Sequence, residues 1–251
     1  MKKGSCMKKQ RSVTKNITTT VLSEYERQEL KYFVPNKLID ILIPELLAYL
    51  EYDRFSQNGF YPIYTTYFDT RDWQAFDAKM AGIQHRQKFR IRSYYPNPTP
   101  NEKVFLEIKA KSDNTVYKVR TPITMDQIGK LQQGEKAPVK NALYDEWRYA
   151  IIRNRIRPRL INTYDRLAFE SEHFPGLRIT LDRNVGYCMT DQVDFTLSPH
   201  AVMWSSELSI LEIKFDRYVP RFVVEILRRY NITLEPISKY CYSVMSNYLL
   251  I

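Results

Sequence analysis

The sequence predicts an α+β fold built around a large antiparallel sheet. Strand-like segments outnumber helical ones, and most of them follow one another directly, which favours antiparallel pairing. Many of these segments alternate charged and apolar residues, so one face of the predicted sheet is apolar and the other carries Lys and Arg. A chain of 251 residues with 44% hydrophobic residues fits one domain with an adequate core.

The elements can be placed in order along the chain. Residues 24–34 alternate like a strand, and Pro35 then opens an amphipathic helix over residues 36–51, which Pro44 is expected to kink or split. Turn residues mostly separate the other expected strands, at 60–69, 86–95, 103–111, 115–123, 157–170, 177–183, 186–197 and 207–216. Further helices are expected at 125–133, 139–153, 219–229 and 240–250.

The charge of the chain is unevenly distributed. Lys and Arg exceed Asp and Glu by 10. Six basic residues and no acidic one precede residue 21, in a stretch without apolar periodicity: Lys2, Lys3, Lys8, Lys9, Arg11 and Lys15. We therefore expect residues 1–20 to be a disordered basic tail and residues 21–251 to form the folded domain. The aromatic residues form no identifiable stacking motif for RNA, so we expect no nucleic-acid partner.

Cysteine usage indicates a reducing compartment. The three cysteines are far apart and form neither a C-x-x-C pair nor a zinc spacing with the histidines: Cys6, Cys188 and Cys241. No signal peptide is visible, and Pro44 and Glu45 interrupt the most apolar segment, residues 38–50. We expect a soluble, cytoplasmic protein without a membrane span.

The strands carry the chemistry, because side chains two residues apart point to the same face. One predicted strand places Lys88, Arg90, Arg92 and Tyr94 opposite Phe89 and Ile91. The next places Lys103, Phe105, Glu107, Lys109 and Lys111 opposite Val104, Leu106, Ile108 and Ala110. Further pairs on one face are Lys118 with Arg120, Tyr164 with Arg166, Arg178 with Thr180 and Asp182, and Glu212 with Lys214 and Asp216.

This alternation has two interpretations. A charged face in water produces the same pattern in an ordinary antiparallel sheet. Periodicity alone favours this first interpretation. The many Arg and Lys, the scarcity of Thr, Ser and Gln, and the isolated acids shift the balance towards an interior. If the sheet curls into a barrel, these cations need anionic partners. Closely spaced phosphates suit them, and a carboxylate can hold a divalent metal that bridges phosphate oxygens.

The order of short motifs resembles that of the vacuolar transporter chaperone (VTC) domain. From residue 27 to 241 they read Glu29-Leu-Lys31-Tyr32, Tyr67-Phe-Asp69-Thr70, Lys88-Phe-Arg90-Ile-Arg92, Leu106-Glu107-Ile-Lys109, Lys118-Val-Arg120, Tyr164-Asp-Arg166, Arg178-Ile-Thr-Leu-Asp182, Leu211-Glu212-Ile-Lys214 and Ser238-Lys239-Tyr240. The resemblance implies a triphosphate tunnel metalloenzyme of the CYTH-like superfamily. Its fold would be a closed, tunnel-like barrel of about eight antiparallel strands with helices packed outside, and its cofactor Mn²⁺ or Mg²⁺.

The resemblance also implies an activity, the transfer of the γ-phosphoryl group of ATP to a growing polyphosphate chain. It implies a set of phosphate-binding cations: Lys31, Arg90, Arg92, Lys109, Lys118, Arg166, Arg178, Lys214 and Lys239, with Arg120 as a further member. Tyr164 would donate a hydrogen bond and Glu212 would hold the metal, while Glu29 and Glu107 are secondary metal candidates.

Two departures from the eukaryotic assemblies leave alternatives open. The chain shows neither a phosphate-sensing domain nor membrane spans, so regulation and export are expected to be absent or supplied by a separate membrane partner. Related triphosphatases begin with Glu-x-Glu-x-Lys, whereas this chain has Arg27 at the first Glu, which favours a polymerase. A triphosphate hydrolase on the same scaffold and a non-catalytic polyphosphate- or nucleotide-binding module remain alternatives.

Overall fold

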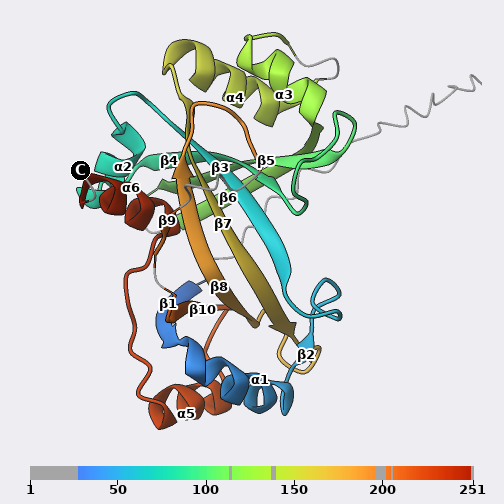
Figure 1. Ribbon diagram of the computed structural model, residues 1–251, viewed down its shortest axis with the longest axis vertical. Coiled ribbons are helices and arrows are strands. Elements are labelled where there is room, and N and C mark those ends of the chain that lie inside the picture. The colour runs from blue at the N-terminus through green and yellow to red at the C-terminus, as the bar shows by residue number, and fades with distance from the viewer. Residues whose placement is uncertain (1–27, 113–114, 137–139, 196–201, 205, 250–251) are drawn as a thin grey trace, which may run out of the picture.

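The computed structural model describes residues 28–112, 115–136, 140–195, 202–204 and 206–249 (Figure 1). Its centre is a ten-stranded sheet whose strand pairs are all antiparallel. Eight strands form a continuous path, in the order β1 (Gln28–Pro35), β10 (Leu208–Phe215), β8 (Arg178–Met189), β7 (Arg157–Glu170), β3 (Tyr61–Asp69), β4 (Arg86–Ser93), β5 (Lys103–Ser112) and β6 (Thr115–Thr124). Two short strands extend it, β2 (Glu51–Tyr52) beside β7 and β9 (Val202–Met203) beside β8. The expected α+β class and antiparallel sheet are confirmed.

The predicted closure of the barrel is not found. In the described part of the chain, the end strands β1 and β6 form no ladder with each other. The sheet is nevertheless strongly curled, because Lys109 of β5 and Glu29 of β1 lie 3.6 Å apart although five strands lie between β5 and β1 along the path. Side-chain contacts across the interior therefore take the place of the missing hydrogen-bond ladder.

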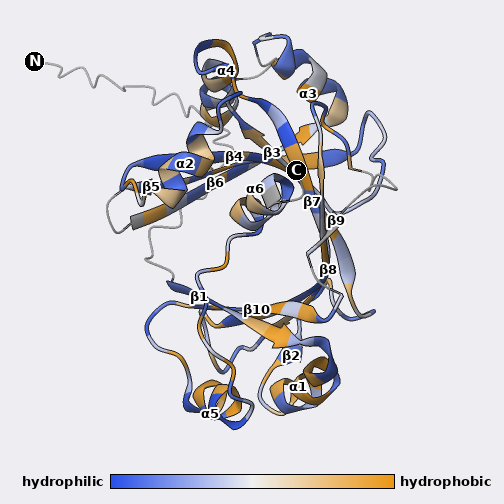
Figure 2. Cartoon of the chain, turned by 60° about the vertical axis from the view of Figure 1, so that its left-hand side comes forward, coloured by the Kyte–Doolittle hydropathy of each residue, from blue (hydrophilic) through white to orange (hydrophobic). Residues whose placement is uncertain are grey.

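Two apolar cores cover the outer, convex face of the sheet (Figure 2). The first lies under α1 (Ile39–Leu47) and α5 (Arg221–Arg229) and contains Leu42, Phe169 and Ile213. The second lies under α3 (Met125–Gln132) and α4 (Ala142–Arg153) and contains Trp147 and Leu106. Burying each of these large side chains contributes roughly 1.5–3 kcal/mol. Packing against these helices therefore keeps apolar residues of β4, β5, β8 and β10 on the outer face, and the charged residues that alternate with them lie on the inner face.

Helix α6 (Lys239–Leu249) corrects the expectation that the helices lie outside. Its first turn reaches the inner face, where Lys239 contacts Asp182 of β8 at 2.5 Å. One turn further, Ser243 accepts a hydrogen bond of 2.6 Å from Asn162 of β7. Figure 2 shows α6 between the two halves of the curled sheet. The helix fills part of the interior with Tyr240 and Val244, whereas α1, α3, α4 and α5 cover the outer face.

Capping residues set where the helices over the second core begin. Thr124 caps α3 with a capping box, in which its hydroxyl accepts from the Gln127 backbone and Gln127 accepts from the Thr124 backbone. Asn141 caps α4 by accepting from two backbone N–H groups. Gly134, with φ of 81°, follows the end of α3, where a side chain would be strained.

Other local differences have identifiable causes. Strand β8 is one strand where two, 177–183 and 186–197, were predicted, because it passes through Asn184 at φ 53° and its ladder with β7 shifts register between Thr163 and Asp165. Pro44 was expected to kink or split the helix, and because it lies inside α1 the helix is not split there.

The described elements also include three that the sequence did not predict, namely β2, β9 and helix α2 (Gln74–Met80). A short 3₁₀ turn, η1 (Asn36–Leu38), precedes α1. The predicted tail, residues 1–20, lies outside the described residues. No helix in the described ranges is long and apolar enough to span a membrane.

Candidate functional site

Charged side chains from seven strands and α6 meet on the concave face of the sheet. We call this set the inner cluster. Its cations are Lys31, Lys88, Arg90, Arg92, Lys109, Lys118, Arg120, Arg166, Lys214 and Lys239, and its carboxylates are Glu29, Glu107, Asp182 and Glu212. It contains all the predicted site residues except Tyr164, which lies against it, and Arg178.

Glu107 is the centre of one half of the inner cluster. Its side chain is 0% exposed and lies within 4.0 Å of four cations: Arg90 at 2.7 Å, Lys118 at 3.1 Å, Arg120 at 3.8 Å and Arg92 at 4.0 Å. Burial opposes ionisation, but these cations outweigh it and hold the pKa of Glu107 well below its usual range. Glu107 is thus a fixed anion that balances only part of the positive charge around it.

The other half contains a pair of carboxylates from neighbouring strands. Glu212 of β10 lies 2.5 Å from Lys214 and 3.6 Å from Lys31, and Glu29 of β1 contacts Lys31 and lies 3.8 Å from Lys214. Burial and Glu212 raise the pKa of Glu29, but the nearby lysines lower it to about 2. Both carboxylates are therefore ionised at neutral pH, and they share two lysines.

Asp182 of β8 is the fourth carboxylate of the inner cluster, and it holds Arg166 of β7 and Lys239 of α6 in place. Arg166 donates two hydrogen bonds, of 2.6 and 2.7 Å, to the two oxygens of Asp182, and Lys239 lies at 2.5 Å from the same group. The Tyr164 ring lies beneath both cations, 4.5 Å from Lys239 Nζ and 5.2 Å from the Arg166 guanidinium carbon. Its hydroxyl lies 3.5 Å from Arg92 Nη2, so Tyr164 links the two halves of the inner cluster.

Arg178 has a different set of partners from the rest. Strand parity gives it the inner face, but it pairs with Asp53 at 2.5 Å and with Glu170 at 3.1 Å. Both carboxylates lie beside the end of β7, since Asp53 follows β2 and Glu170 is the last residue of β7. The structure therefore places Arg178 at the rim of the inner cluster.

Several lysines of the inner cluster carry a charge that is poorly compensated. Burial and the neighbouring Arg90 and Arg92 lower the pKa of Lys118 to about 7, against the opposing effect of Glu107. Burial is also the largest cause that lowers the pKa of Lys109. Yet the side chains of Lys109 and Lys118 are 40% and 39% exposed, so solvent reaches them. Cations that are crowded but accessible can accept an anionic ligand.

Lys88 belongs to the inner cluster although the resemblance assigned it no role. Its ammonium lies 3.5 Å from Ser238 Oγ, 3.6 Å from Cys241 Sγ and 4.7 Å from the centre of the Tyr240 ring. Burial lowers its pKa. Strand alternation had predicted that Lys88 shares a face with Arg90 and Arg92, and the structure confirms this position.

The chemistry of the donors decides which residues could hold a metal. Among the described residues, no three Asp, Glu, His or Cys side chains come together as a metal site. The pair Glu29 and Glu212 fits Mg²⁺ or Mn²⁺, because Mg²⁺ is commonly held by one or two carboxylates while substrate phosphates supply further ligands. Glu107 fits less well, since it is one carboxylate among four cations, whereas Glu29 and Glu212 are two carboxylates among three lysines.

The comparison of sequences agrees with this geometry. The VTC domain matches residues 26–248, which is nearly the whole chain. The chain belongs to the VTC domain family. A search of curated proteins found no match to it.

A search of solved structures found proteins similar to this VTC domain. A Bacillus halodurans protein, provisionally described as an adenylate cyclase, superposes with a TM-score of 0.53 at 15% sequence identity, over 85% of this chain and 95% of its own. A Vibrio parahaemolyticus protein described in the same way gives 0.46 at 12% identity, over 88% and 98% of the two chains. At 15% identity the likeness to the Bacillus halodurans protein shows that the two chains share a fold.

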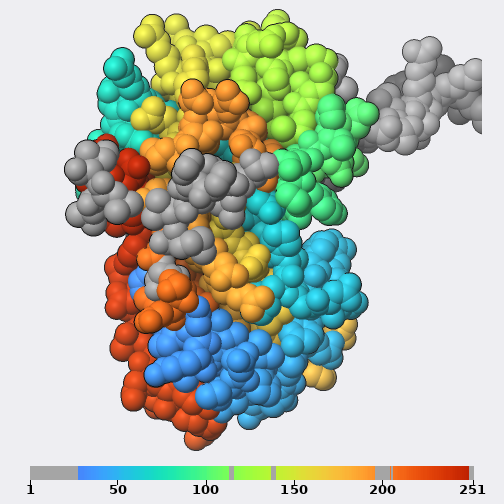
Figure 3. Space-filling view, viewed as in Figure 1, coloured from blue at the N-terminus to red at the C-terminus, as the bar shows by residue number. Residues whose placement is uncertain are grey.

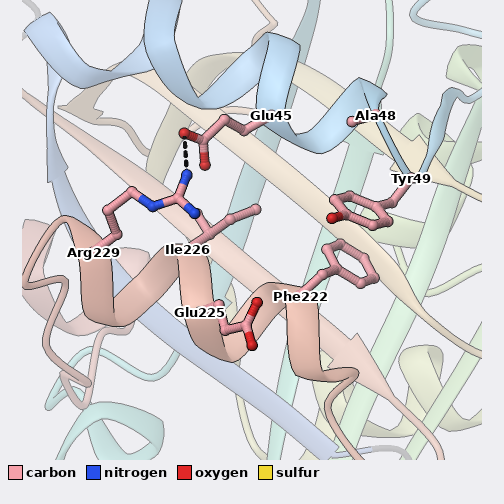
Figure 4. A pocket seen from close by; sticks show the side chains of 7 residues that line it. All are labelled: Glu45, Ala48, Tyr49, Phe222, Glu225, Ile226 and Arg229. Carbon is pink, nitrogen blue, oxygen red and sulfur yellow. Dashed lines mark hydrogen bonds and ion pairs between the residues drawn. The ribbon is translucent and has the colours of Figure 1, made fainter.

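A groove outside the sheet is separate from the inner cluster. It has a volume of about 200 Å³ and lies between α1 and α5. Figure 4 shows Arg229 paired with Glu45 across it, at 2.8 Å, and the Tyr49 and Phe222 rings facing each other. The two ring centres are 4.2 Å apart and nearly parallel. These contacts hold α1 against α5, and they involve no residue of the inner cluster.

Proposed function

We propose that this VTC domain is an ATP-dependent polyphosphate polymerase, which transfers the γ-phosphoryl group of ATP to a growing polyphosphate chain. One observation carries the proposal. The half of the inner cluster around Glu107 brings Arg90, Arg92, Lys118 and Arg120 within 4.0 Å of one carboxylate. A chain of phosphates provides the closely spaced negative charge that such a group of cations lacks.

The proposed roles follow from the charge around each residue. The cations of β4, β5 and β6 bind phosphate oxygens, with Arg side chains gripping two oxygens at once and Lys side chains acting as point charges. Lys31 and Lys214 sit beside the carboxylate pair and bind the phosphates closest to it. The Tyr164 hydroxyl, which accepts from Arg92 Nη2, donates its own hydrogen to a phosphate oxygen.

Phosphoryl transfer suits a site of this kind, because it requires positioning and charge neutralisation more than covalent chemistry. Glu29 and Glu212 would hold Mn²⁺ or Mg²⁺, which when bound neutralises charge on the phosphates. The neighbouring Asp182 supports the site differently: it fixes the Arg166 guanidinium and the Lys239 ammonium in place. The chain's own residues thus orient donor and acceptor phosphates along one face.

Incubation of the purified protein with ATP and Mn²⁺ tests the proposal, with long-chain polyphosphate detected on gels. The account predicts polymer that grows with time and disappears on treatment with an exopolyphosphatase. Release of only ADP and phosphate would assign the site to triphosphate hydrolysis. Tight binding of polyphosphate without turnover of ATP would make the domain a binding module.

A further inference from the structure

Four aromatic side chains gather at the end of the concave face where β3 begins and β4 ends. They come from separate segments: Phe55 from the turn after β2, Tyr61 from β3, Tyr94 from just after β4, and Phe105 from β5. The centre of the Tyr94 ring is 6.4 Å from that of Tyr61 and 5.8 Å from that of Phe105. We call these four residues the aromatic patch.

Phe55 and Tyr94 present nearly parallel rings at this end of the concave face. They lie 6° from parallel with their centres 6.4 Å apart. A flat ring between two others needs about 7 Å, twice a carbon–carbon contact of ~3.5 Å. Phe55 is 60% exposed, so it can shift by the small distance required. In Figure 3 the light-blue segment between β2 and β3, which carries Phe55, forms part of the molecular surface.

The aromatic patch is continuous with the inner cluster. The Arg120 guanidinium lies 3.7 Å from the centre of the Phe105 ring and 5.9 Å from that of Tyr94, while its Nε is 3.8 Å from Glu107. Burial raises the pKa of Tyr94, but Arg92 and Arg120 outweigh it and lower the pKa overall. A ligand whose phosphates reach these arginines therefore brings whatever is attached to them against the rings.

We propose that the aromatic patch binds the base of a nucleoside triphosphate by stacking, while the inner cluster holds its phosphates. This inference rests on the proposed function, because it assigns the part of ATP that polyphosphate lacks. Stacking explains why aromatic rings rather than polar side chains line this end. It also gives the site a means to distinguish ATP from a polyphosphate chain, since only ATP carries a ring.

Binding measurements with two ligands test the inference. We would titrate the wild-type protein and Phe55→Leu with ATP and with inorganic tripolyphosphate, using calorimetry. Leucine keeps an apolar side chain but removes the flat face, so ATP affinity is expected to fall roughly fivefold or more. Tripolyphosphate affinity is expected to stay unchanged. Phe55→Trp, which offers a larger ring, is expected to keep or raise ATP affinity.

Tyr149→Leu is the matched control, because Tyr149 is an exposed aromatic residue on α4, away from the aromatic patch. It is expected to bind both ligands like wild type. Equal affinities of Phe55→Leu and wild type for ATP would overturn the inference, as would an equal loss for both ligands. A change of oligomeric state in Phe55→Leu with unchanged ATP affinity would instead assign the patch to contact with a second copy. Wild-type protein that binds neither ligand would overturn the proposed function together with this inference.

Discussion

The two halves of the inner cluster are built by the same strand alternation but carry different balances of charge. Around β4, β5 and β6, four cations surround one buried carboxylate, Glu107. Around β1 and β10, Glu29 and Glu212 share two lysines, Lys31 and Lys214. The first half has an excess of positive charge, which suits the binding of phosphates. In the second, two carboxylates lie among three lysines, since Glu29 is also 3.6 Å from Lys109, and Mg²⁺ is commonly held by one or two carboxylates.

A carboxylate that lies among cations can therefore serve either of two purposes. Glu107 is 0% exposed and has a cation on several sides, so it acts as an internal counter-ion that allows the strands to come together. Glu212 has a second carboxylate, Glu29, as a neighbour. The negative charge of Glu212 raises the pKa of Glu29, and the nearby lysines lower it. The same substitution in each half should therefore have different consequences.

The largest effect is expected for Glu212→Gln. Removing this charge leaves the phosphate-binding cations in place but removes a proposed metal ligand, so polyphosphate synthesis from ATP should fall at least about 100-fold. Product gels measure it. Glu225→Gln is the matched control, since Glu225 pairs with Arg221 on the outside of α5, and it should synthesise polymer normally. Near-wild-type synthesis by Glu212→Gln would remove Glu212 from the mechanism.

Glu107→Gln should mainly affect stability. It leaves several cations of β4, β5 and β6 without their buried partner, so the free energy of unfolding should fall by about 3 kcal/mol. Tripolyphosphate should restore more stability to this variant than to wild type, because the ligand replaces the missing charge. Denaturant unfolding with and without ligand measures both effects. A variant as stable as wild type, with no extra response to the ligand, would contradict the role of Glu107 as a counter-ion.

The pH dependence of phosphate binding sharpens the account of the first half. With a pKa of about 7, Lys118 of the free protein is mostly charged at the acidic end of the neutral range and mostly uncharged at the alkaline end. Bound phosphate favours the charged form and raises this pKa, so binding takes up a proton and weakens as pH rises. Affinity for tripolyphosphate should fall about tenfold between roughly pH 6 and pH 8 through this residue.

Lys118→Met provides the comparison for that measurement. Its tripolyphosphate affinity should be lower than that of wild type at acidic pH. The tenfold fall in affinity between roughly pH 6 and pH 8 that is expected from Lys118 should be absent. Calorimetry in buffers of different ionisation enthalpy counts the protons taken up. Equal proton uptake by both proteins would show that another group is responsible.

The smallest effect is expected for Lys88→Met. The ammonium of Lys88 contacts Ser238, Cys241 and the Tyr240 ring, and burial lowers its pKa. Methionine removes a charge that is costly to bury, so the protein should be as stable as wild type or up to about 1 kcal/mol more stable. Affinity for long polyphosphate should fall a few-fold, as expected for one lost contact. A clear loss of stability would show that Lys88 stabilises the fold.

Strand alternation predicted much of this site from the sequence. It identified the inward residues of β4 and β5, including Arg90, Arg92 and Lys109, because their apolar neighbours form the outer core. It could not show that the sheet stays open between β1 and β6, since closure depends on the curl of all the strands.

The sequence also could not show which acidic and basic residues pair with each other. Arg166 meets Asp182 because a register shift between β7 and β8 sets their pairing, and such a shift leaves no clear local signal. The inward position of α6 depends on packing around Tyr240 rather than on its own pattern. Phe55 lies in a turn, where alternation gives no direction.

The division of roles between the two halves is tested most directly by the effect of Mn²⁺ on tripolyphosphate affinity, measured for wild type, Glu212→Gln and Glu107→Gln. The account predicts that Mn²⁺ strengthens binding several-fold in wild type and in folded Glu107→Gln, and has little effect in Glu212→Gln. Without Mn²⁺, Glu212→Gln should bind at least as tightly as wild type, because it has lost a negative charge and kept every cation. Equal strengthening by Mn²⁺ in all three proteins would contradict the account.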